Sequence, residues 1–218
     1  TMITGVLGAA AHNEFRRILS FHIISQVGYM ILGLALNTTL ALAGAVFYLI
    51  HHIIVKANLF LVSGVVQRLS GSFELSRSVG SDSKYGWTAL CFFIPAFSLA
   101  GFPPLSGFWA KMILIRASLD IHHYLVAGIA AAVGLLTVYS MTKIWGEVFW
   151  KPAPRADTGD EVSLAAGPSG WMMTPIAGLV ILTVIIGFGA EAFVEIALQA
   201  AEELLHPEMY LKAVLGPK

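Results

Sequence analysis

Five long apolar runs constrain this chain more than any other feature. They cover residues 18–36, 40–66, 86–118, 124–149 and 171–190. About 20 consecutive apolar residues are enough for a helix to cross the hydrocarbon core of a bilayer. A helix also satisfies its own backbone hydrogen bonds there, where no water is present. The chain is therefore predicted to be an all-α integral membrane protein, a bundle of transmembrane helices.

Composition supports this class and excludes others. The 218 residues are 57% hydrophobic and 12% charged, too few polar residues to cover a soluble domain. A formal net charge of zero gives no basis for binding nucleic acid. The single cysteine, Cys91, cannot form an intrachain disulfide. The opening TMITGVLGAAAH lacks the basic start of a signal peptide and is typical of a helix end, so we expect a longer parent chain.

Charged and turn-forming residues divide the chain. Residues 1–150 are expected to form a helix tail and four spans, residues 151–170 a loop rich in Pro, Gly and charge, and residues 171–218 a final span and tail. Lys and Arg gather in alternate loops, including 67–85, which predicts that these loops and 151–170 are cytoplasmic and the C-terminus external. Segment 191–205 is predicted to be an amphipathic helix with an acidic face, at the outer surface or against a partner.

The run at 86–118 is too long for one straight helix. As such its 33 residues would extend about 50 Å, against a hydrocarbon core of about 30 Å. Its middle contains Pro103 and Pro104, which remove backbone donors, flanked by the helix-weakening Gly101 and Gly107. We expect Ser106 to cap a second half-helix. A broken helix at membrane depth is typical of an ion or substrate site, although a kink used only for packing is the alternative.

Lys111 follows the break within the same run. An ammonium at the bilayer centre costs roughly 2.5–3.5 kcal/mol on insertion scales. Snorkelling to the interface explains it less well than a function does, because Arg116 is nearer the end of the run. Desolvation disfavours the charged amine, so a lysine at such a depth can take up and release protons.

The segment FYLIHHIIVKANLFLVSG, residues 47–64, carries a second set of titratable groups. Tyr48, His52 and Lys56 recur every four residues and share one stripe of a helix. Imidazole, phenol and desolvated amine are the groups of a proton relay. His51 points about 100° away and is expected to face a different neighbour. Structural hydrogen bonding is the alternative for the stripe.

Other polar positions give weaker signals. His22 and Gln26 could extend the polar path or join two helices by hydrogen bonds. Lys143 and Glu147 are also path candidates, and the alternative is an interfacial ion pair between them, which we favour for Glu147. No metal site, cofactor or catalytic residue is predicted. A haem protein is an alternative, with ligands among His22, His52 and His122, but the buried lysines disfavour it. A passive scaffold is a further alternative.

Three segments carry a resemblance to a known family. They are FRRILSFHIISQVGYMILGLAL at 15–36, IHHIIVKANLFLVSG at 50–64 and GFPPLSGFWAKMILI at 101–115. In this order they resemble the C-terminal part of the antiporter-like subunits shared by respiratory complex I and Mrp-type cation/proton antiporters. Within that family the amino-acid sequence of residues 18–64 is most similar to that of the D-type subunits of the Mrp branch.

The resemblance implies a fold and residue roles. Family members have fourteen transmembrane helices with two inverted five-helix repeats, and this chain would hold the second repeat, without most of its first helix, and the final helix. By position, Lys56 matches the central channel lysine, His52 the histidine one turn before it, and Lys111 the broken-helix lysine. Some complex I subunits have a second histidine at the position of Tyr48, and other complex I subunits have glutamate at the position of Lys111. The Glu/Lys pair of the first repeat is absent from these residues.

The resemblance also implies a function. The chain would be part of a proton-translocating subunit of a multisubunit Na⁺/H⁺ antiporter, multi-pass in the inner (plasma) membrane of a prokaryote. It would move protons in exchange for exported cations, as a secondary transporter subunit rather than an enzyme. Its expected partners are the other subunits of the complex and the membrane lipid. The alternative is a proton-pumping membrane subunit of complex I (NADH-quinone oxidoreductase) or of a related membrane hydrogenase.

Overall fold

The computed structural model describes residues 1–77, 85–151 and 170–216. Their secondary structure is helical apart from an isolated β-bridge between Glu14 and Glu74. The helices are α1 (Met2–Ala11), α2 (Phe15–Leu36), α3 (Thr39–Ser70), α4 (Gly86–Ala100), α5 (Ser106–Asp120), α6 (Tyr124–Trp145), α7 (Gly170–Phe188), α8 (Ala190–Leu205) and α9 (Glu208–Leu215). A 3₁₀ turn, η1 (Leu75–Arg77), follows α3, and a π-helical turn, η3 (Gly146–Trp150), continues α6.

Within the described ranges, four helices are long and apolar enough to cross a membrane. They are α2, α3, α6 together with η3, and α7. This confirms four of the predicted apolar runs as single helices. The fifth run forms two shorter helices, α4 and α5.

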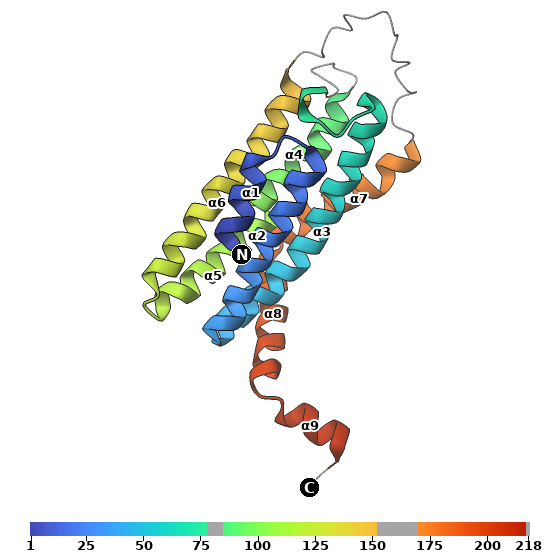
Figure 1. Ribbon diagram of the computed structural model, residues 1–218. Coiled ribbons are helices and arrows are strands. Elements are labelled where there is room, and N and C mark those ends of the chain that lie inside the picture. The colour runs from blue at the N-terminus through green and yellow to red at the C-terminus, as the bar shows by residue number, and fades with distance from the viewer. Residues whose placement is uncertain (78–84, 152–169, 217–218) are drawn as a thin grey trace, which may run out of the picture.

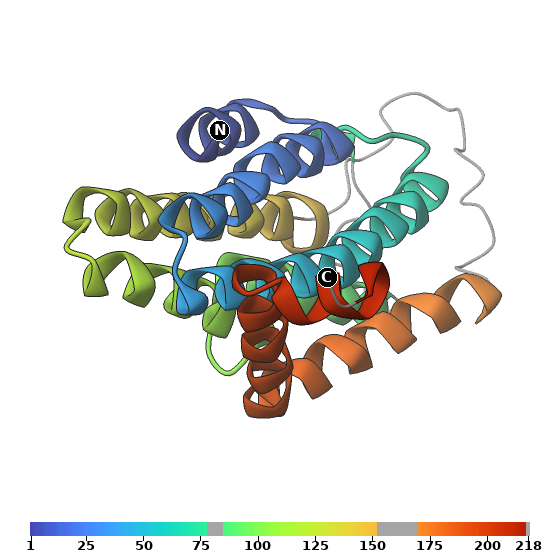
Figure 2. The ribbon, with the colours of Figure 1, turned by 90° about the horizontal axis from the view of Figure 1, so that it is seen from below.

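Helix α3 is the centre of the bundle. Its 32 residues extend about 48 Å, more than the thickness of the hydrocarbon core. The Thr38 hydroxyl caps its start by accepting from the Ala41 N–H, and Gly71 ends it in the left-handed conformation. It contacts α2, α4, α5, α7 and α8. Seen from below, α1 and α7 lie on opposite sides with α3 between them (Figure 2).

The described turns fall at the two ends of the bundle. The α2–α3 and α5–α6 turns lie at one end, and η1 and η3, which contact each other, lie at the other (Figure 1). The predicted loop at 151–170 falls almost wholly outside the described residues. The predicted amphipathic helix is confirmed as α8, which buries Ala197 and Ala201 while Glu191 and Glu195 are exposed.

The predicted break lies between Ala100 and Ser106, with both prolines inside it. Each half-helix has 15 residues and extends about 22 Å, so neither crosses a bilayer core alone. Gly101 has a φ of 95°, which only glycine adopts without strain, and its N–H closes the end of α4 by donating to the Phe97 and Ser98 carbonyl oxygens.

The apolar core is divided into two clusters by a layer of polar side chains. On α2 the buried members of one cluster end at Leu19, and those of the other begin at Tyr29. On α3 the boundary falls between Tyr48 and Val55. Across the broken helix it falls between Leu99 on α4 and the first turns of α5. The polar side chains between the two clusters therefore form a band at mid-length of the described bundle.

Candidate functional site

The polar layer collects side chains that the sequence places on three different helices. They are at most 7% exposed and comprise His22, Ser25 and Gln26 on α2, His51, His52 and Lys56 on α3, and Lys111 on α5. The Tyr29 ring on α2 joins these groups, because it lies 5.2 Å from the Tyr48 ring on α3 and 5.4 Å from the Lys111 Nζ on α5. The stripe on α3 and the lysine after the break therefore belong to one site.

Lys56 points from α3 to α2. Its Nζ donates to the backbone carbonyl oxygen of Leu19 at 2.9 Å. Among the ion pairs of the described residues, none includes Lys56. One carbonyl oxygen cannot satisfy the three donors of a charged ammonium. A permanent charge at this position would therefore be costly.

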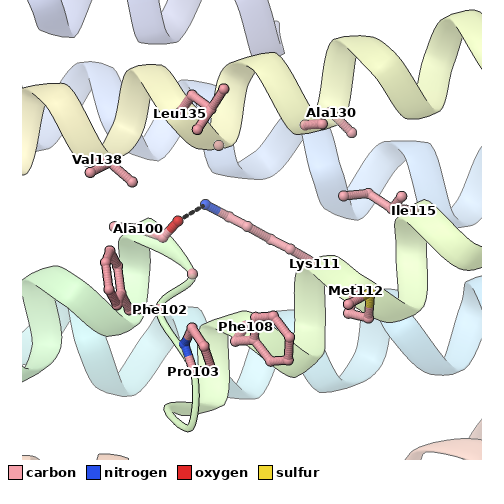
Figure 3. Close-up of a pocket in the computed structure, with 13 residues that line it drawn as sticks. Ala100, Phe102, Pro103, Phe108, Lys111, Met112, Ile115, Ala130, Leu135 and Val138 are labelled. Carbon is pink, nitrogen blue, oxygen red and sulfur yellow. Dashed lines mark hydrogen bonds between the residues drawn. The ribbon is translucent and has the colours of Figure 1, made fainter.

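Lys111 reaches back across the break to the end of α4 (Figure 3). Its Nζ donates to the carbonyl oxygens of Leu99 at 2.8 Å and Ala100 at 3.1 Å. The last carbonyls of a helix lack intrahelical partners and carry the negative end of the helix dipole. The break thus creates the acceptors that hold the Lys111 ammonium.

A cavity of about 300 Å³ borders Lys111. It lies between the break, α5 and α6, and its lining is mostly apolar, including Phe102, Met112 and Leu135 (Figure 3). Lys111 is one of the residues that line this cavity, and its ammonium donates to the carbonyl oxygen of Ala100 at the end of α4.

Two stacked tyrosines lie at the edge of the layer, next to Lys111. The rings of Tyr29 and Tyr48 are 5.2 Å apart and nearly parallel. The Tyr48 hydroxyl donates to Gln26 Oε1, and the Tyr29 hydroxyl donates to the Ala130 carbonyl oxygen at 2.5 Å. The Lys111 Nζ lies 5.4 Å from the Tyr29 ring centroid, within the range of a cation–π interaction.

Several buried nitrogens of the layer have no hydrogen-bond partner among the described residues. They are both ring nitrogens of His22, Nε2 of His51, Nε2 of His52 and Nε2 of Gln26. Buried polar side chains are hydrogen-bonded in the large majority of cases. The layer therefore has unused donors and acceptors next to its two lysines.

Ser106 does not cap α5 as expected. The N-cap is Leu105, which makes no side-chain cap hydrogen bond, and Ser106 is the first helical residue. Its Oγ lies 2.8 Å from His51 Nδ1 and 3.1 Å from Ser98 Oγ instead. The prediction was wrong because neighbouring helices supply partners for Ser106. Gly107 does more than weaken the helix. It allows the start of α5 to approach α4 closely, because a Cβ at this position would overlap the Ser98 carbonyl oxygen.

The predicted Lys143–Glu147 ion pair is also wrong. Lys143 Nζ donates to the carbonyl oxygens of Ala10 at 3.2 Å and His12 at 2.9 Å, at the end of α1. Glu147 pairs with Lys151 instead. Helix α1 packs against α6, and the unsatisfied carbonyls at its end attract the lysine more than the helical neighbour does.

The haem alternative placed His122 beside His22 and His52. His122 is exposed in the turn between α5 and α6, with Nδ1 2.9 Å from the Tyr124 hydroxyl. His22 and His52 are buried in the polar layer. The structure therefore does not bring His122 to the other two.

Sequence reasoning missed Tyr29, Ser98 and the carbonyl oxygen of Leu19 as members of the site. Tyr29 and Ser98 are polar residues in apolar runs, and a buried phenol or hydroxyl needs a partner. The need for a hydrogen-bond partner was therefore a signal in the sequence for Tyr29 and for Ser98. A backbone carbonyl leaves no signal in the sequence.

The fold and this layer define a class: a multi-pass α-helical membrane protein with ionisable groups inside its bundle. A family profile described as NADH:quinone oxidoreductase/Mrp antiporter, TM, matches residues 1–137. The chain belongs to this family, which confirms the resemblance.

Relatives narrow the position within the family. The chain is 47% identical over 215 residues to the D-type subunit of the Na⁺/H⁺ antiporter of Alkalihalophilus pseudofirmus, covering 99% of the chain and 43% of the relative. It is 33% identical over 222 residues to that of Bacillus subtilis, with 99% and 43% covered. It also superimposes on a chain of the Mrp complex from Dietzia sp. DQ12-45-1b with a TM-score of 0.89 and 34% identity, covering 99% of this chain and 47% of that one. The chain is thus a homologue of the D-type antiporter subunits and spans less than half the length of these relatives.

Proposed function

We propose that this chain is the C-terminal part of a proton-translocating subunit of a multisubunit Na⁺/H⁺ antiporter in a prokaryotic plasma membrane. Its partners are the other subunits of that complex, and it exchanges protons for exported cations as a secondary transporter. The two antiporter relatives, 47% and 33% identical, support this function over a role in complex I.

The proposed proton route follows the polar layer. His52 and Lys56 exchange the proton first, with Tyr48 as a weaker member, and Lys111 receives it at the break. His22 and Gln26 flank this route, and water bonded to their unpartnered nitrogens would bridge the remaining gaps. The observation that carries the proposal is two buried lysines whose hydrogen-bond partners are neutral, in a layer that also holds imidazoles with unused nitrogens.

The proposed architecture is the second inverted repeat of an antiporter-like subunit. Residues 1–150 form its core, with α4 and α5 as the broken helix. Residues 151–170 are cytoplasmic, and residues 171–218 form the final span and an external tail. The described turns at the two ends of the bundle support the alternation of sides (Figure 1), and the Lys and Arg residues of the alternate loops support the cytoplasmic assignment.

The proposal is tested with Lys56→Ala and Lys111→Ala in the full-length subunit within its complex. Each variant should lose most Na⁺-driven proton movement in everted vesicles, measured with a pH-sensitive dye, while assembly of the complex is unchanged. Arg116→Ala is the matched control, because Arg116 is an exposed cation on the same helix as Lys111. Near-normal antiport by either lysine variant, in an assembled complex, would contradict the route.

A further inference from the structure

The Lys111 ammonium has more donors than the helix break has acceptors for it. Its Nζ donates to the carbonyl oxygens of Leu99 at 2.8 Å and Ala100 at 3.1 Å, and the described parts of the chain offer it no further hydrogen-bond acceptor. A charged ammonium carries three N–H groups. The third interaction comes from the Tyr29 ring, because Nζ lies over this ring at 5.4 Å from its centroid. The face of an aromatic ring attracts a cation within about 6 Å.

The Tyr29 ring is held by contacts to two neighbouring helices. Tyr29 belongs to α2, and its hydroxyl donates to the Ala130 carbonyl oxygen of α6 at 2.5 Å. Its ring stacks on the Tyr48 ring of α3, with the centroids 5.2 Å apart and the planes 10° apart. Tyr29 is also fully buried. Attraction between a cation and an aromatic ring is stronger where both are removed from water, so this ring can act strongly on the Lys111 ammonium.

An aromatic ring distinguishes the two protonation states of a lysine. It attracts the ammonium, whereas the neutral amine carries no positive charge for its face to attract. We propose that Tyr29 is a positioning residue, whose ring holds the Lys111 ammonium at the break and so sets the pH at which Lys111 takes up and releases a proton. This deepens the proposed function and rests on it, because proton exchange at Lys111 is part of the proposed route.

The charged groups on the helices around α5 do not replace the ring. His51 on α3 and His22 on α2 are the imidazoles that act electrostatically on Lys111, and a positive charge on either repels its ammonium. The described residues of α4 and α7 include no carboxylate, amine, guanidinium or imidazole. On α6, Lys143 bonds to the end of α1. The ring and the two carbonyl oxygens are therefore the described groups that favour the charged form of Lys111.

The proposal is tested by weakening the face of the ring while its shape is kept. In the assembled complex, Tyr29 is replaced by Phe and by Phe that carries one, two or three ring fluorines, which withdraw electron density from the face. Solid-state NMR of the complex, labelled with nitrogen-15 at the lysine Nζ atoms, distinguishes ammonium from amine across a pH series. The Lys111 signal is the one that is missing from Lys111→Gln.

The expected result is a graded shift. Tyr29→Phe keeps the ring and should leave the midpoint of the Lys111 transition nearly unchanged, although it loses the bond to Ala130. Added fluorines should move the midpoint progressively to lower pH, by about 0.5–1 pH unit for three, because only the ammonium loses attraction. Tyr29→Leu should shift it at least as far. An unchanged midpoint with three fluorines would overturn the inference, and so would a shift in Tyr29→Phe as large as that in Tyr29→Leu.

Phe108 supplies the matched control. It lies on α5, lines the same cavity as Lys111 (Figure 3), and packs edge-on against Trp109 with centroids 5.2 Å apart. Three fluorines on Phe108 should leave the Lys111 midpoint unchanged. A shift equal to that at Tyr29 would show a general effect of fluorine and overturn the role of Tyr29.

Antiport measured on the same preparations separates the two proposals. A fluorine-dependent midpoint in a complex without antiport contradicts only the proposed function. Normal antiport with a fluorine-independent midpoint contradicts only the role of Tyr29.

Discussion

The Trp109 indole N–H donates to the Gly187 carbonyl oxygen at 3.1 Å, which joins the helix after the break to the end of α7. Trp109→Phe keeps an aromatic ring beside Phe108, whose ring centroid lies 5.2 Å from that of Trp109, and removes this hydrogen bond. We expect it to lower the stability of the assembled subunit by about 1 kcal/mol, seen as a lower midpoint of thermal unfolding. Trp87→Phe is the control, because Trp87 is 58% exposed on α4. Equal midpoints for both variants would show that the bond contributes nothing.

His52 and Lys56 should behave as one unit in transport. They are one turn apart on α3, and groups that act in series are non-additive when removed. We expect His52→Ala and Lys56→Ala each to impair proton-linked transport, and the double variant to be little worse than the more damaging single. Transport in vesicles across a pH series checks this, with assembly measured separately. Additive losses would instead assign the two residues to structural hydrogen bonding.

Lys111→Glu should transport protons only under acidic conditions. The Leu99 and Ala100 carbonyl oxygens that hold the ammonium are acceptors, so an ionised carboxylate meets repulsion there and only the protonated acid can donate to them. Activity of this variant should therefore fall as pH rises. Lys111→Gln donates at every pH but exchanges no proton, and should be inactive throughout. A pH-independent Lys111→Glu would contradict the geometry.

The proposed orientation predicts which sites an impermeant thiol reagent reaches on intact cells. Ser76→Cys, exposed in η1, should be protected, and His206→Cys, exposed after α8, should be labelled. Cys91 is 1% exposed, so the unmodified protein supplies the background. Labelling of the first site with protection of the second would invert the topology.

Features set by residues close together in the sequence were predictable, and hydrogen-bond partners on other helices were not. Two adjacent prolines remove two backbone donors and interrupt a helix, so the break near Pro103 could be placed in advance. Spacing of four on one helix likewise fixes that Tyr48, His52 and Lys56 share a stripe. The acidic face of α8 follows from the same periodicity.

Lys143 and Ser106 show why the remainder was not predictable. Both have nearby residues in the sequence that could have served as partners, Glu147 for one and the first turn of α5 for the other. Each bonds instead to an element distant along the chain, Lys143 to the end of α1 and Ser106 to α3. Which helices become neighbours is decided by packing of the whole bundle, and that packing is not encoded in any short segment.

The central position of α3 has a consequence for how the chain can vary in length. On α3, Tyr48 and Lys56 bond to Gln26 and Leu19 of α2, respectively. His51 bonds to Ser106 of α5, and Asn58 bonds to Ile176 of α7. One inserted or deleted residue in α3 would turn everything beyond it by about 100° and shift it by about 1.5 Å. An insertion before Tyr48 would misalign all four bonds together. Loops can gain or lose residues without this effect, so length changes among working copies of this chain should be absent from Thr39 to Asn58 of α3.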